Sequence, residues 1–131
     1  MTEFQRVNSD ALPIIRSPLS HATRVGDLLF VSGMPPYYAE RTFVPGDFDA
    51  QFKQVMKNLT AVLEAGGSSV DRVIKTTVIL TARDQFEAMN RLYREHFVDP
   101  YPSRTTIVTD LGIEGMMLEI ECVAHCTGPA Q

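Results

Sequence analysis

The chain has 131 residues, of which 44% are hydrophobic and 21% are charged, and its formal net charge is −4. This profile is typical of one globular domain, so we expect residues 1–131 to form a single domain. The acidic balance and the lack of clustered Lys and Arg argue against nucleic-acid binding, because phosphate contact needs grouped cations. The apolar runs are too short to cross a membrane, and the first residues do not resemble a secretion signal. We therefore expect a cytoplasmic protein.

Residues 22–33 predict the first paired strands. A β-rich run surrounds the dipeptide Gly26-Asp27, which is typical of a hairpin turn. The proline-containing stretch 34–47 predicts a loop, with a short strand near 42–44.

Residues 49–65 predict the first helix, because their apolar side chains recur at the spacing of one helical face. Asp47 or Asp49 is expected to cap its beginning. Gly66 and Gly67 are expected to end it, since glycine tolerates the left-handed closing conformation.

The second half of the chain predicts a strand at 72–81, a helix at 84–97, and strands at 103–109 and 116–125. A glycine-containing turn between the last two strands predicts that they pair as a hairpin. Asn90 falls on the apolar face of the second helix, where it is either a satisfied core amide or part of a site.

The element order is therefore β-β-α-β-α-β-β, which predicts an α+β fold with one sheet of five to six strands. Both helices are expected on one face of that sheet. Strand segments such as 28–31 and 78–80 are apolar on both sides, which indicates that both faces are buried. Because little chain remains for a second layer, we expect another copy of the chain to cover the open face.

Charged residues inside the last two strands need an explanation. Arg104 at the start of one strand ordinarily reaches water or pairs with a local acid. Glu119 and Glu121 share one side of the last strand, which is ordinarily a solvated face. If a neighbouring copy covers that face, at least one carboxylate lies in a partly dry cleft with a raised pKa. Arg104 or Thr106 could lie opposite these glutamates in a hairpin, although the sequence leaves the register open.

Cys122 and Cys126 lie four residues apart in the expected last strand, a spacing unsuited to a mutual disulfide. Two reduced thiols fit a cytoplasmic protein. His125 lies between them, but a second ligand pair at the spacing of a zinc site is missing, so no metal is expected.

Five stretches carry a family resemblance: "VGDLLFVSG" at 25–33, "NLTAVLEAGGSSVDRVIKTTVIL" at 58–80, "MNRLYREHF" at 89–97, "PSRTTI" at 102–107 and "LEIE" at 118–121. The chain resembles the Rid (YjgF) family of small imine and enamine deaminases, and the resemblance extends over almost its whole length. The resemblance implies a chorismate-mutase-like fold, a homotrimer with its sites in clefts between subunits, and no cofactor.

The resemblance also implies roles for individual residues. Arg104 matches the arginine that holds the substrate carboxylate, and Glu119 matches the glutamate that positions and activates a water. Thr106 matches the residue whose backbone carbonyl contacts the substrate nitrogen.

Other matching residues are expected to line the pocket. Ser32 and Gly33 match the family's "SG", Asn90 matches an asparagine on the second helix, and Tyr101 matches an aromatic residue before the arginine. Leu19 departs from the family, because the founding deaminases carry a tyrosine at this place. Its loss removes a hydroxyl and leaves a more apolar wall, which bears on the choice of substrate.

These matches imply hydrolysis of 2-imino acids, or of their enamine tautomers, to 2-oxo acids and ammonia. One alternative is a pathway-specific deaminase of a larger enamine acid, such as an aminomuconate. Another is a non-catalytic module that binds small carboxylates. A ribonuclease role has also been attached to the family, but the acidic charge argues against it here.

Overall fold

The structure is a computed structural model that describes residues 3–131. It contains six strands and two α-helices, with short 3₁₀ turns before β4 and before α2. In chain order these are β1 (Phe4–Val7), β2 (Ala22–Val25), β3 (Leu28–Met34), α1 (Phe48–Ala65), β4 (Val73–Leu80), α2 (Phe86–His96), β5 (Ser103–Val108) and β6 (Leu118–His125). The strand β1 was not predicted from the sequence, and the short strand expected near 42–44 is absent, because these residues form irregular loop.

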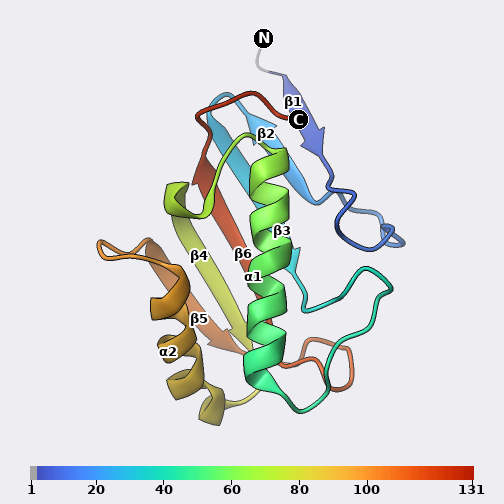
Figure 1. The fold of residues 1–131 in the computed structure, drawn as a ribbon, viewed down its shortest axis with the longest axis vertical. Helices are drawn as coiled ribbons and strands as arrows, with labels where there is room; N and C mark the ends of the chain where they lie inside the picture. Colours follow the sequence, from blue (N-terminus) through green and yellow to red (C-terminus); the bar gives the residue numbers. More distant parts are fainter. Residues whose placement is uncertain (1–2) are drawn as a thin grey trace.

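The six strands form one sheet in the order β1-β2-β3-β6-β4-β5. All neighbouring strands are antiparallel except β4 and β5, which are parallel. Both helices lie on one face of the sheet, with α1 over its middle and α2 near the β4–β5 end (Figure 1). The predicted α+β architecture is therefore confirmed, as is the hairpin of β2 and β3.

The predicted hairpin of the last two strands is wrong. β6 lies between β3 and β4, and β5 pairs with the far side of β4 at the edge of the sheet. The turn signal itself was correct, since Gly112 and Gly115 both adopt positive φ angles of 76° and 84°. A turn does not decide which strands pair, however, and the alternating apolar side chains of β6 are best buried at a central position.

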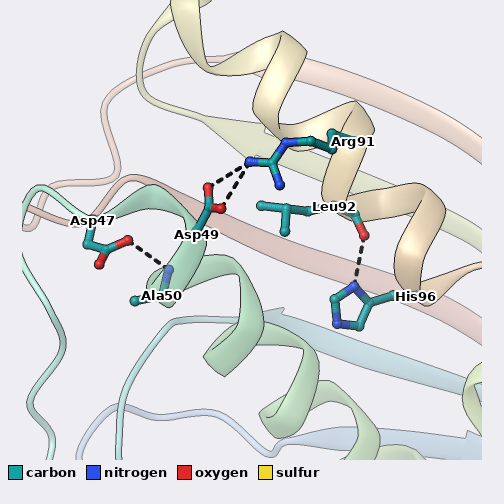
Figure 2. Close-up of polar contacts among 6 residues, drawn as sticks. All are labelled: Asp47, Asp49, Ala50, Arg91, Leu92 and His96. Atoms are coloured by element: carbon teal, nitrogen blue, oxygen red, sulfur yellow. Dashed lines mark hydrogen bonds and ion pairs between the residues drawn. The ribbon is translucent and has the colours of Figure 1, made fainter.

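The beginning of α1 is capped by Asp47, one of the two candidates. Its carboxylate accepts a hydrogen bond from the backbone N–H of Ala50 at 3.0 Å (Figure 2). The other candidate, Asp49, accepts two hydrogen bonds of 3.0 Å from Arg91 of α2 instead. At the other end, Gly67 adopts a φ of 84°, which explains why a glycine follows this helix.

The hydrophobic core lies between the helices and the sheet. Its fully buried members include Leu29 of β3, Phe52 of α1 and Ile120 of β6. Because side chains alternate along a strand, the residues next to Leu29 and Ile120 point to the other face of the sheet. On that face Phe30 is 45% exposed and Ile107 of β5 is 42% exposed. Within residues 3–131, neither helix is both long and apolar enough to cross a membrane.

Candidate functional site

Glu119 is held against the backbone of β3. The pairing of β3 with β6 is irregular between Val31 and Met34, so two residues of β3, Ser32 and Gly33, fill a bulge. A Cβ atom built on Gly33 would lie only 2.7 Å from Oε1 of Glu119. The missing side chain at Gly33 is therefore what allows the carboxylate to occupy this place.

The Glu119 carboxyl group is a weaker acid than an ordinary glutamate. Burial raises its pKa, and the nearby Glu121 carboxylate raises the pKa further. A carboxyl group of this kind exchanges protons closer to neutral pH, as a general acid or base must.

Glu119 opens into a cavity of about 210 Å³, called here the first cavity. Three other predicted site residues, Leu19, Ser32 and Gly33, also line it. The Ser32 hydroxyl donates a hydrogen bond of 2.7 Å to the backbone oxygen of Ser20. This bond ties the segment that carries Leu19 to β3, and so fixes one wall of the cavity.

The first cavity also contains His21, which sequence reasoning left without a role. Its Nδ1 accepts a hydrogen bond of 3.0 Å from the backbone N–H of Ser9, so this nitrogen carries no proton. Burial lowers the pKa of His21, which also favours the neutral ring. Nε2 therefore bears the proton and is the ring nitrogen left to donate.

Two arginines, Arg16 and Arg41, also line the first cavity. Both come from irregular segments, before β2 and after β3. Sequence reasoning missed them because no local pattern indicates that two separate loops close over the same strand.

Arg104 lies in a different hollow, called here the second cavity, of about 310 Å³. Asn90 and Tyr101 line it as well, so these three predicted residues are brought together. The guanidinium lies over the Tyr93 ring, 5.0 Å from its centroid, and one N–H points to the sulfur of Met89 at 3.6 Å. This cation–π contact fixes the arginine while its other N–H groups stay available.

Arg104 and Glu119 lie on opposite faces of the sheet. Arg104 is beside Thr76 in the β4–β5 pair, and the buried Thr76 hydroxyl shares a hydrogen bond of 2.8 Å with Tyr93 of α2. Glu119 is beside Ile79, three residues further along β4. An odd separation along a strand places side chains on opposite faces. One chain therefore holds the two groups apart, whereas a hairpin with Arg104 directly opposite Glu119 would have placed them on one face.

Thr106 lies on β5 beside Val78 and is half-buried. It shares the helix-covered side with Arg104, two residues earlier in the strand. It lines neither the first nor the second cavity.

The two cavities offer complementary chemistry. The first holds a carboxyl group suited to proton transfer, and the second holds a fixed cation suited to a carboxylate.

The chain is similar to one protein family and to several known proteins. Residues 10–126 match the family model described as Endoribonuclease L-PSP. Protein mmf2, mitochondrial, of Schizosaccharomyces pombe is 38% identical over 110 residues, which are 82% of this chain and 86% of that protein. Reactive Intermediate Deaminase A, chloroplastic, of Arabidopsis thaliana is 32% identical over 119 residues, which are 90% of this chain and 64% of that protein.

Solved structures share the fold along almost the whole chain. The crystal structure of YEO7 from yeast has a TM-score of 0.89 at 30% identity and covers 95% of this chain and 100% of that one. The structure of Escherichia coli TdcF with bound serine has a TM-score of 0.83 at 28% identity and covers 94% of this chain and 99% of that one. The family model and these relatives agree with the resemblance seen in the sequence, and the chain is a member of the Rid (YjgF) family.

Proposed function

We propose that this protein hydrolyses 2-imino acids, or their enamine tautomers, to 2-oxo acids and ammonia. The observation that carries the proposal is the Glu119 carboxyl group, which is held against Gly33 in a cavity and has a raised pKa. Membership of a family that includes a protein named Reactive Intermediate Deaminase A supports it. The reaction needs water and proton transfer, so the proposal includes no metal or organic cofactor.

The working site is composed of two copies of the chain. Arg104 and Glu119 lie on opposite faces of the sheet within one chain, so the two side chains of a single copy cannot both contact one small substrate. The open sheet face carries exposed apolar side chains, such as Phe30 and Ile107, which a second copy would cover. A homotrimer, in which the second cavity of one subunit meets the first cavity of the next, satisfies both observations.

In this site Arg104 binds the substrate carboxylate and orients the C=N carbon toward a water. Thr106 supplies its backbone carbonyl to the substrate nitrogen. The water oxygen bonds to the imine carbon while Glu119 accepts a water proton, and the nitrogen takes that proton to give a carbinolamine. Glu119 then accepts the carbinolamine hydroxyl proton and passes it to the amine. As the C=O bond forms, the C–N bond breaks with its electron pair on nitrogen, which releases ammonia and the 2-oxo acid. Such proton relays contribute roughly 10²–10⁴-fold to the rate.

The test follows imine decay directly. An amino-acid oxidase with catalase generates the imine, and semicarbazide traps what remains. We expect the wild type to accelerate decay, and Arg104→Ala and Glu119→Gln each to lose most of that acceleration, roughly 10²-fold or more. Arg83→Ala and Glu87→Gln, which change exposed residues before and on α2, serve as controls with unchanged rates. Equal decay with the wild type and with Arg104→Ala would refute the proposal.

A second candidate is a module that binds small carboxylates without turnover. The serine bound to the related TdcF favours keeping it. In that case the wild type would hydrolyse no imine, and Glu119→Gln would keep full affinity for a 2-oxo acid in calorimetry. The net charge of −4 disfavours RNA as the substrate, despite the family model's description.

The cellular location expected from the sequence stays a prediction. We propose a cytoplasmic protein because its two cysteines are free thiols, both buried. The names of the two relatives place those proteins in mitochondria and in chloroplasts. Fluorescence microscopy of the tagged full chain in its source cell would decide between these locations.

A further inference from the structure

The first cavity contains more positive charge than the proposed reaction uses. Arg16 and Arg41 both line it, and Glu119 is the one acidic residue in the lining. Among residues 3–131, the ion pair joins Arg91 to Asp49. Neither Arg16 nor Arg41 lies within ion-pair distance of a carboxylate in this part of the chain. The pKa of Glu119 is raised by burial and by Glu121, with no arginine offsetting them. The two cations therefore do not serve as counter-ions for the catalytic acid.

Arg41 is fixed in place rather than free in solvent. Its backbone adopts a φ of 63°, which is uncommon for a residue with a side chain, in a turn closed by a hydrogen bond of 2.9 Å to the Tyr38 oxygen. Its guanidinium lies over the Tyr37 ring, 5.4 Å from the centroid, and donates to the backbone oxygen of Ile14. A guanidinium has five N–H donors, so most of them remain available to a ligand.

We propose that Arg41, supported by the charge of Arg16, binds a second carboxylate of the substrate. This inference rests on the proposed function, in which Arg104 of another copy binds the first carboxylate. The substrate class is then the imine or enamine of a dicarboxylic acid. The Arg41 guanidinium is planar and already oriented by Tyr37 and Ile14, so it suits a carboxylate, because little side-chain freedom is lost on binding.

The apolar part of the cavity fits the chain between the two carboxylates. Leu19, Met34 and Met116 line it. A methylene chain gains from such walls, whereas a small polar imine acid does not fill them. The apolar lining therefore favours a substrate longer than a small imine acid.

The experiment compares two sets of imines made by amino-acid oxidases in the presence of catalase. One set derives from alanine and leucine, and the other derives from aspartate, glutamate and 2-aminoadipate. Arg41→Asn removes the cation and still tolerates the positive φ, and Arg83→Asn is the matched control away from the cavity. We expect Arg41→Asn to lower kcat/KM at least about tenfold for one or more dicarboxylic imines, and to leave both monocarboxylic imines within about twofold.

Calorimetry makes the inference independent of turnover. The wild type should bind 2-oxoglutarate more tightly than 2-oxobutanoate, and Arg41→Asn should abolish that difference. If the wild type hydrolyses no imine, the proposed function fails, and the binding preference alone decides the inference. If turnover is present but Arg41→Asn affects both imine sets alike, or neither, the second-carboxylate subsite is refuted while the proposed function stands.

Discussion

At the scale of single residues, the position of the Glu119 carboxylate depends on the absence of a side chain at Gly33. A methyl group at Gly33 would lie 2.7 Å from the Glu119 carboxylate, whose side chain is flexible enough to move away. We expect Gly33→Ala to reduce imine hydrolysis at least about tenfold, because the acid is displaced, with little change in Tm. Circular dichroism and the imine-decay assay measure the two effects.

Gly66→Ala gives the contrasting result. There the added Cβ would lie 2.5 Å from Cδ2 of Leu29, which is fully buried in the core. We expect a loss of about 1–3 kcal/mol in the free energy of unfolding, with normal activity in the folded protein. A Gly33→Ala variant that is destabilised like Gly66→Ala, yet fully active, would contradict the assigned role of Gly33.

The pH dependence of the reaction follows from the pair Glu119 and Glu121. The Glu121 carboxylate raises the pKa of Glu119, second to burial, because two like charges disfavour ionisation. Glu121→Gln removes this charge and lowers the pKa of Glu119, so the base form persists to lower pH. We expect the acidic limb of the kcat/KM profile to move to lower pH. A limb that stays in place, or moves to higher pH, would show that Glu119 is not the titrating base.

At the scale of elements, the beginning of α1 offers a comparison between two adjacent kinds of polar contact. Asp47 caps the helix through the Ala50 N–H, whereas Asp49 pairs with Arg91 at the surface (Figure 2). The paired side chains are 45% and 53% exposed, so water screens their attraction. We expect Asp47→Ala to lower the free energy of unfolding by about 1 kcal/mol and Asp49→Ala by at most about 0.5 kcal/mol. Urea denaturation measures both, and a reversed order would contradict this assignment.

Helices and strands differ in how far the sequence predicted them. The helix α1 was recognised because its apolar stripe and Asp47 are local signals. The strand β1 was missed because three of its four residues are exposed and carry no apolar alternation. The position of β6 between β3 and β4 depends on contacts between distant segments, which a turn signal at Gly112 does not contain.

The candidate site was predicted through its chemistry more than through its geometry. Arg104 and Glu119 stood out as charges inside apolar strands, and the family resemblance suggested their roles. Their separation onto opposite faces followed only from the strand order. His21 and Arg41 were missed because their place in the first cavity arises when loops fold back over β3.

At the scale of the whole molecule, the proposed site has a property that a single-chain site lacks. If Arg104 and Glu119 act from different copies, two inactive variants can restore each other. We expect Arg104→Ala and Glu119→Gln, unfolded and refolded together in equal amounts, to recover about a quarter of wild-type activity, as random mixing in a cyclic oligomer requires.

The control for this complementation is each variant refolded alone, which should stay inactive. Light scattering with size-exclusion chromatography reports whether the mixture forms a trimer. A mixture that assembles but recovers no activity would contradict a site shared between copies. Recovery in a monomeric sample would contradict it equally.

The place of β6 in the sheet has a consequence for how the chain acquires its structure (Figure 1). β6 (Leu118–His125) is the strand that pairs with both β3 and β4. During synthesis, before β6 has been made, the nascent chain can therefore form only two separate parts of the sheet. Cooperative folding then waits for the last strand to emerge. The strand that carries Glu119, the proposed catalytic acid, is thus also the one that joins the two halves of the sheet, so we expect truncation before it to abolish both stability and activity.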